Sequence, residues 1–249
     1  MTETINTLQL TDNSKTKFKH GHYNTFGLNY GLPSNGGTCP GATSGPGGCL
    51  HLKREGGVNA TCYMANLVKA YPSFRRVLDK NTKLLQGKTQ AEMVVTLTNT
   101  VNLFIKLSKN TDLYFRISTS GDFFSEDYAK AWAEVISQFP QVQFWVYTRS
   151  LWAIPILVGC SNLALYISSD NVNFKAARQV FEAHKHHNNL GISYMGNTEA
   201  LPKNDRWVVC PQITGKVPNT PGQGACAKCC LCFTYNGKIR LRNINFPIH

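Results

Sequence analysis

The amino-acid sequence predicts an α/β fold built on a parallel sheet that is open or curled into a partial (β/α) barrel. Segments with strand character alternate with segments of helical periodicity from residue 113 to residue 210. Alternation of this kind makes successive strands parallel, because each helix returns the chain to the same end of the sheet. A chain of 249 residues, 42% of them hydrophobic, is also long enough to bury a full-sized core.

The expected strands are short and apolar. They cover residues 113–118, 142–148, 163–168, 190–194 and 207–210. Residues 1–62 are rich in Gly, Asn, Thr and Pro and are expected to form loops.

Helices are expected at about 63–80, from Thr89, from Ser125 and from Phe174 to Lys185. Thr89 and Glu92 have the spacing of a capping box, and two acidic residues follow Ser125 in the first helical turn. We expect residues 1–200 to form the α/β partial barrel with N-terminal cysteine loops. Residues 201–249 would form a cysteine-rich, metal-binding module packed on it.

Composition predicts a cytosolic protein without a membrane segment. The N-terminus is polar, and the longest apolar run, Leu151 to Cys160, is interrupted by Pro155 and shorter than the roughly 18 residues of a membrane span. Cytosolic thiols seldom form structural disulfides, so nine cysteines in such a chain favour metal binding or redox chemistry.

The formal charge of +12 is concentrated in residues 69–109 and 203–242. Such a surface attracts nucleic acid, a phosphorylated or other small-molecule substrate, or an acidic partner. A solvated basic face is the simpler interpretation. No motif that reads a nucleic-acid groove accompanies the charge.

The C-terminal cysteines form the stronger metal motif. Cys226-x2-Cys229-x2-Cys232 follows an upstream Cys210-Pro211. Ferredoxins use a similar run together with a Cys-Pro to hold a [4Fe–4S] cluster, although there the Cys-Pro ends the run. Four thiolates also hold zinc, which stays an alternative at this site. Cys230 interrupts the run as a bystander or a substitute ligand.

An N-terminal group consists of Cys39, Cys49 and Cys62. Three ligands leave one metal position open, which suits a second cluster that binds a small molecule. The alternatives are a structural cluster with a fourth ligand, such as His51, or three cysteines that never meet. Cys160 lies in an apolar run and is expected in the core.

Several of these motifs together resemble a known family. Two lie in the first half of the chain: Cys39-Pro40 followed by Cys49 and Cys62-Tyr63, and the stretch Ser120 to Ser125. The other two are Cys210-Pro211-Gln212 with the C-terminal cysteine run, and the closing Asn245 to His249. In these motifs the chain resembles the phage "gene product eighty-eight" family from about residue 20 to its end. The resemblance implies a viral origin, a location in the host cytoplasm and an iron–sulfur protein, but no substrate.

A more distant resemblance is to radical S-adenosylmethionine enzymes. In those, three N-terminal cysteines hold a four-iron cluster, and a turn after the next core strand binds the amino group of the cofactor. Ser120, Gly121 and Asp122 stand at that place here. The wide cysteine spacing departs from the family's pattern, and Asp122 could equally form a turn or cap. Polar residues 148–150 and 168–170 should lie on the same edge of the sheet.

Two functions remain open at this point. The first is a redox enzyme of the radical S-adenosylmethionine type, with one or two [4Fe–4S] clusters. The second is a non-catalytic, metal-stabilised protein that binds nucleic acid or a host protein through its basic face.

His184, His186 and His187 near a helix end are expected to interact with the helix dipole and solvent.

Overall fold

The predicted parallel sheet is present and open. The structure, a computed structural model, describes residues 6–18, 24–43, 48–50, 62–109, 113–197, 199, 201–202, 205, 207–233 and 241–247. In this part of the chain one sheet has six strands, all parallel, in the order β1-β2-β3-β4-β6-β5. They are β1 (Leu113–Arg116), β2 (Val142–Thr148), β3 (Leu163–Ser169), β4 (Leu190–Met195), β5 (Trp207–Val209) and β6 (Asn243–Phe246). β1 and β5 form its two edges, so the sheet does not close into a barrel.

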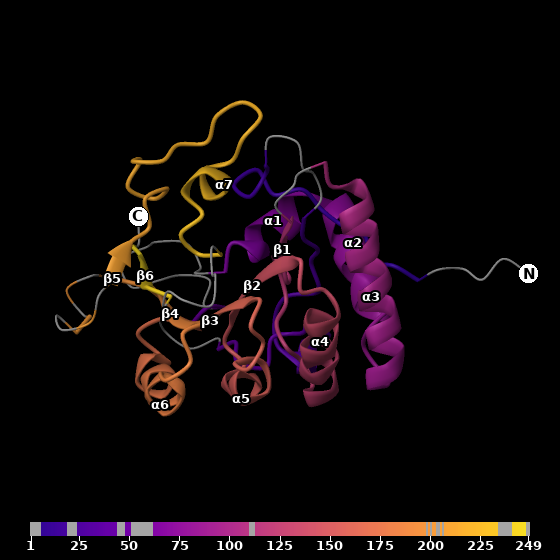
Figure 1. Cartoon of the computed structure of the whole chain (residues 1–249), viewed down its shortest axis with the longest axis horizontal. Helices are drawn as coiled ribbons and strands as arrows, with labels where there is room; N and C mark the ends of the chain where they lie inside the picture. Colours follow the sequence, from indigo (N-terminus) through magenta and orange to yellow (C-terminus); the bar gives the residue numbers. More distant parts are fainter. Residues whose placement is uncertain are drawn as a thin grey trace, which may run out of the picture.

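The central strands β2, β3 and β4 are almost wholly buried, as parallel strands covered on both faces require, whereas the edge strands β1 and β5 are mostly half-buried. Helices cover one face (Figure 1). In the described part of the chain, counting both faces, the helices are α1 (Met64–Ala70), α2 (Pro72–Lys83), α3 (Gln90–Leu107), α4 (Glu126–Gln138), α5 (Ile154–Leu157), α6 (Phe174–His184) and α7 (Ala225–Cys229), with 3-10 turns η1 (Pro33–Asn35) and η2 (Leu151–Ala153). Of these, α4, α5 and α6 connect successive strands from β1 to β4 and lie on the same side of the sheet.

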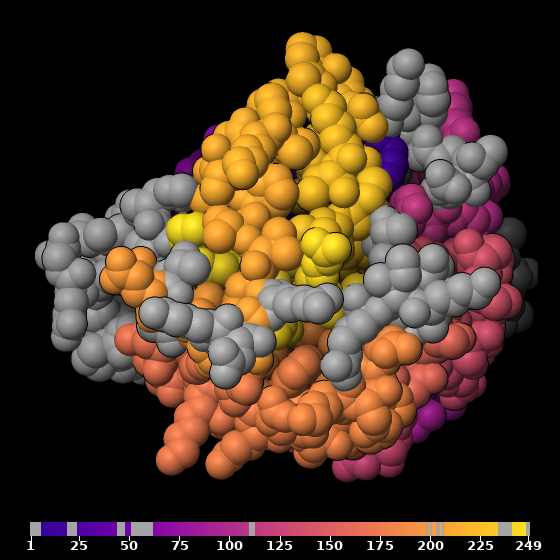
Figure 2. Space-filling model, turned by 60° about the vertical axis from the view of Figure 1, so that its left-hand side comes forward, coloured from indigo at the N-terminus to yellow at the C-terminus, as the bar shows by residue number. Residues whose placement is uncertain are grey.

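The C-terminal segment covers the opposite face. Its α7 lies above the sheet in Figure 1, and the segment after β5 spreads over the upper part of the surface in Figure 2 (gold). Phe233 anchors it: its ring stacks on Trp145 with centroids 4.5 Å apart and contacts Tyr114 at 4.9 Å. The cysteine-rich segment therefore packs directly on the strands that come early in the chain, while its own β5 and β6 extend the same sheet.

Several expected elements differ from those observed. The single helix expected at 63–80 is two helices, because Pro72 begins a new helix after Tyr71. β6 was not predicted, and it lies between β4 and β5. The apolar run Leu151–Cys160 contains η2 and α5. The helix starts are as predicted: Thr89 forms a reciprocal capping box with Glu92, and Ser125 accepts a hydrogen bond from the Tyr128 backbone N–H.

Within the described residues, no helix combines the length and apolar character that crossing a membrane would need.

Candidate metal centre

The four cysteines of the C-terminal motif border one cavity. This cavity lies between the C-terminal segment and the sheet, and apart from the thiols its walls are largely apolar. Its cysteines are Cys210, Cys226, Cys229 and Cys232, and its apolar residues include Leu231, Phe233 and Ile244. The structure thus brings together two segments that are fifteen residues apart in the sequence.

Backbone hydrogen bonds place these thiols. The Cys210 N–H donates to the Asn245 carbonyl of β6 at 2.9 Å, and the Cys226 N–H donates to the Lys15 carbonyl at 2.8 Å. Cys226 and Cys229 lie three residues apart on α7 and so share one side of the helix. Cys230 ends α7 in a left-handed conformation, at φ 55°. That turn directs the chain so that Cys232 also reaches the cavity.

Cys230 does not border the cavity, because its Sγ contacts the Ala227 carbonyl at 3.1 Å. The thiols that do border it are poorly solvated. Burial raises the pKa of Cys232 to about 12, although the Tyr147 hydroxyl lowers it through a hydrogen bond. Burial also raises the pKa of Cys226, which the positive charge of Arg116 lowers. A metal would therefore have to displace protons from these thiols.

Four cysteine thiols are a ligand set for either zinc or an iron–sulfur cluster. Among the described residues, no three His, Cys, Asp or Glu side chains converge closely enough to hold a single metal ion. The four cysteines border the same cavity without meeting at one point.

The N-terminal cysteines also come together. The Cys62 N–H donates to the Cys49 carbonyl at 2.9 Å, and Cys39 lies close enough to Cys49 and Cys62 for thiolate charge on either to raise the pKa of its own thiol. Burial raises the pKa of each of these thiols. The Tyr63 hydroxyl, next to Cys62, donates to the Thr119 carbonyl and so ties this group to the loop after β1. His51 lies outside the described residues.

The predicted residues Ser120, Gly121 and Asp122 form that loop, and each is occupied by contacts within the protein. The Ser120 hydroxyl donates to the Leu28 carbonyl at 2.7 Å. Gly121 has φ 83° and lies so close to Thr38 that a side chain would not fit. The loop thus packs against the segment that leads into Cys39.

The Asp122 carboxylate joins two strand ends. It accepts hydrogen bonds from the Thr148 hydroxyl at 2.5 Å and from the backbone N–H groups of Arg149 and Phe123, each at 2.8 Å. Burial raises its pKa, while these hydrogen bonds lower it. Because a carboxylate has about four acceptor positions, most of the hydrogen-bonding capacity of Asp122 is already used.

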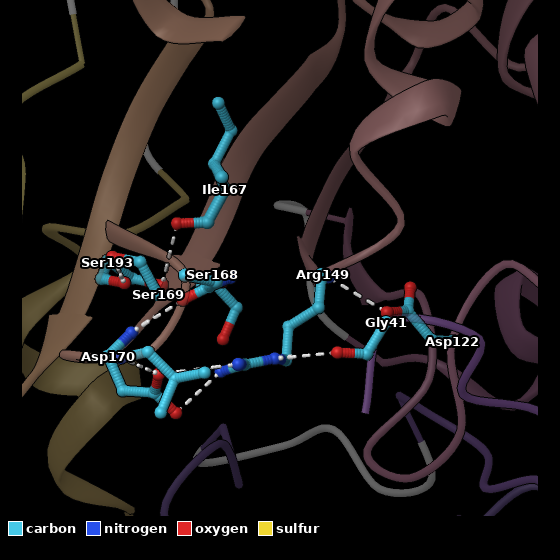
Figure 3. Close-up of polar contacts among 10 residues, drawn as sticks. Gly41, Asp122, Arg149, Ile167, Ser168, Ser169, Asp170 and Ser193 are labelled. Atoms are coloured by element: carbon cyan, nitrogen blue, oxygen red, sulfur yellow. Dashed lines mark hydrogen bonds and ion pairs between the residues drawn. The ribbon is translucent and has the colours of Figure 1, made fainter. Parts of the chain in front are cut away.

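A buried ion pair lies beside this loop (Figure 3). Arg149, which follows β2, donates through its guanidinium to both carboxylate oxygens of Asp170, at 2.8 and 3.3 Å. Its Nε donates to the Gly41 carbonyl at 3.2 Å, in the segment between Cys39 and Cys49. Arg149 also lowers the pKa of Cys49. The prediction that residues 148–150 and 168–170 share one edge is therefore confirmed, and the N-terminal cysteines lie at that edge.

The remaining predicted residues lie elsewhere. Cys160 packs against the helix-side core, as expected, and burial raises its pKa to about 11. His184 ends α6 and clusters with His186 and His187, whose ring centroids lie 4.1 Å apart. The contact of Tyr147 with Cys232 was not predicted from the sequence. The place of Tyr147 on the same face as Trp145, two residues earlier, was the available signal.

Comparison with known proteins confirms the predicted family resemblance. Residues 5–235 match the family model described as Gene product 88. The chain is 34% identical to the Gene 88 protein of Mycobacterium phage L5 over 224 residues, covering 87% of this chain and 84% of the relative. It is 36% identical to the Gene 88 protein of Mycobacterium phage D29 over 218 residues, covering 84% and 82%. No solved structure matches significantly. The chain therefore belongs to the Gene product 88 family, which includes these bacteriophage proteins.

Proposed function

We propose that this protein is an iron–sulfur protein whose C-terminal cysteines hold a [4Fe–4S] cluster. The observation that carries the proposal is the single, otherwise largely apolar cavity bordered by Cys210, Cys226, Cys229 and Cys232. Four thiolates are the ligand set of such a cluster, and an apolar wall limits its exposure to solvent. When bound, a cluster would supply one-electron redox chemistry.

The arrangement of the thiols favours a cluster over zinc. Zinc draws four sulfur atoms to about 2.3 Å from one point, whereas a cubane cluster spreads its ligands over four corners. Cysteines that enclose a space fit the second geometry. Zinc is the alternative against which the proposal is tested.

A second part of the proposal concerns Cys39, Cys49 and Cys62. These thiols interact with one another at the carboxyl edge of a parallel sheet, which is where ligands of such sheets bind. We propose that they hold a second cluster with one open position, which binds S-adenosylmethionine as in radical enzymes. Ser120, Gly121 and Asp122 would border that cofactor. The Asp122 carboxylate would then accept a hydrogen bond from the cofactor's amino group in addition to those it already accepts within the protein.

The formal charge of +12 favours a second candidate function. In that case the metal is structural, and the basic face binds nucleic acid or a host protein. A metal-stabilised fold without catalysis needs only the C-terminal cysteines.

Anaerobic purification followed by iron, sulfide and zinc analysis tests the proposal. We expect iron and sulfide in the wild type, and their loss together with thermal stability in Cys229→Ser, because metal binding and folding are coupled in such sites. Cys160→Ser is the matched control and should retain its iron. Zinc without sulfide would mean that the site holds a structural zinc ion and not a cluster. Full metal content in Cys229→Ser would mean that Cys229 is not a ligand.

Electron paramagnetic resonance of the reduced protein tests the second cluster. Addition of S-adenosylmethionine should change the spectrum of the wild type, because the cofactor contacts the open iron. A variant with Ala at Cys39, Cys49 and Cys62 should lose this response and keep the absorbance of the C-terminal cluster. An unchanged wild-type spectrum at saturating cofactor would reject the radical-enzyme part and favour the non-catalytic candidate.

A further inference from the structure

Two tyrosines, one half-buried and one fully buried, lie beside the C-terminal cysteines. Tyr147 of β2 and Tyr166 of β3 occupy paired positions in the sheet, and their rings stack with centroids 5.3 Å apart. Tyr166 is fully buried in the core on the cysteine-covered face. Both hydroxyls lie in a region from which water is largely excluded.

Both tyrosines lie in the same packed cluster as Cys232: Tyr166 is part of the buried cluster, and Tyr147 and Cys232 pack against it. The Tyr147 hydroxyl forms a hydrogen bond with the Cys232 thiol that favours the thiolate. Tyr166 lies close enough to Cys232 for their charges to interact, yet within the described part of the chain its hydroxyl has no hydrogen-bond partner. An unsatisfied buried hydroxyl is destabilising, so such groups generally have a partner in the functional state.

Arg116 adds a positive charge to the same region. Its guanidinium lies over the Tyr147 ring, 5.5 Å from the centroid, and its charge stabilises the thiolate of Cys226. Its Nε is buried and likewise has no hydrogen-bond partner among the described residues. A cation held against a tyrosine in a poorly solvated region has a strong effect on nearby negative charge.

We propose that Tyr147, Tyr166 and Arg116 form an outer shell that sets the reduction potential of the cluster held by the C-terminal cysteines. This inference rests on the proposed iron–sulfur function. Reduction by an external one-electron donor adds one negative charge to the site, and the shell stabilises that charge through two hydroxyl donors and one cation. Outer-shell hydrogen bonds to sulfur are among the features through which proteins set such potentials.

Redox titration of the holoprotein with dithionite tests the tyrosines. Tyr147→Phe and Tyr166→Phe should each shift the midpoint potential to a more negative value. At a fixed solution potential the ratio of reduced to oxidised cluster should fall about two- to tenfold, since one hydrogen bond contributes roughly 0.5–1.5 kcal/mol. Tyr128→Phe is the matched control: this tyrosine is also buried, but it lies in the helix-side core, away from the C-terminal cysteines.

A second pair of variants tests the charge. Arg116→Met should lower the potential, whereas Arg116→Lys, which keeps the charge, should lower it less. Unchanged potentials in the tyrosine variants, with intact iron and sulfide, would overturn this inference and leave the proposed function standing. If a tyrosine variant yields no folded protein, equal potentials for the two Arg116 variants would overturn it. A wild type that contains zinc and no sulfide would instead overturn the proposed function itself.

Discussion

The carboxylate of Asp122 links the loop after β1 to the end of β2 through three hydrogen bonds. It is 9% exposed, and all three of its donors belong to the protein. The backbone N–H groups of Phe123 and Arg149 would have no acceptor without it. At the scale of single residues, the charge of Asp122 therefore serves first to order the edge at which the N-terminal cysteines meet.

Asp122→Ala should destabilise the protein by about 1–3 kcal/mol for each buried donor that it leaves unsatisfied. The free energy of unfolding from chemical denaturation measures this effect. Asp127→Ala, on the exposed first turn of α4, is the control and should change stability much less. If the two variants were equally stable, Asp122 would not have this structural role.

The raised pKa of Cys232 predicts how the stability of the metal-free fold depends on pH. Its thiol has a pKa of about 12 in the folded protein, above the ordinary value of 9.0, so it keeps its proton. The stability that it contributes to the metal-free fold is therefore complete below about pH 9 and is lost as the pH rises toward about 12.

Zinc added to the metal-free protein must displace this proton. Its apparent affinity should rise at least about tenfold per pH unit between roughly pH 6 and pH 8, and more steeply if other thiols also lose protons. Competition with a chromophoric chelator measures the affinity. An affinity that does not depend on pH would show that Cys232 is not a ligand.

At the scale of secondary structure, the carboxyl ends of β2 and β3 hold the N-terminal loop. Arg149 and Asp170 follow these strands as a buried pair, with side chains 10% and 3% exposed. Arg149 also bonds to Gly41, and the backbone of Gly41 lies so close to Arg149 that a Cβ would clash. The ends of two strands thus position the segment from Cys39 to Cys49.

Arg149→Met should destabilise the protein by about 3–5 kcal/mol, because it leaves the Asp170 carboxylate buried without its partner. The double variant Arg149→Met with Asp170→Leu should recover part of this loss, which a double-mutant cycle measures. Lys130→Met breaks the exposed pair with Glu126 and serves as the control, with little expected effect. Additive losses in the cycle would mean that the two side chains act independently.

At the scale of the whole molecule, the net charge of +12 is a property of the surface and not of the fold. If this charge binds duplex DNA, the logarithm of the binding constant should fall with the logarithm of salt concentration, by about 0.9 for each phosphate contacted. Fluorescence anisotropy with a labelled duplex gives this slope. Absence of binding at about 50 mM salt would reject the nucleic-acid candidate.

Replacing Lys238, Arg240 and Arg242 by Glu reverses three charges and tests the C-terminal basic stretch. Lys238 and Arg240 lie outside the described residues. The matched control reverses Lys130, Lys175 and Lys185, which lie outside both basic stretches and are exposed. Both variants change the net charge equally. A weaker affinity only in the first would locate binding in the C-terminal basic stretch, and equal losses would indicate an effect of overall charge.

The features that could be predicted from the sequence alone are those that depend on near neighbours along the chain. β2 lies at the predicted residues, 142–148, because a short apolar run needs only its own side chains to indicate a buried strand. Thr89 and Ser125 begin helices as predicted, since capping involves residues within one turn. The cysteine spacing likewise identified the four thiols that border one cavity.

Which distant segments meet became known only from the folded structure. β6 contains Asn243 and Asn245 and lacks an apolar run, so its place between β4 and β5 depends on pairing with strands far away in the sequence. The contact of Tyr147 with Cys232, and the position of Arg149 beside the N-terminal cysteines, arise in the same way. Periodicity and spacing record local preferences. The packing of one segment across the face of a sheet depends on contacts between residues that are many positions apart, which no local pattern contains.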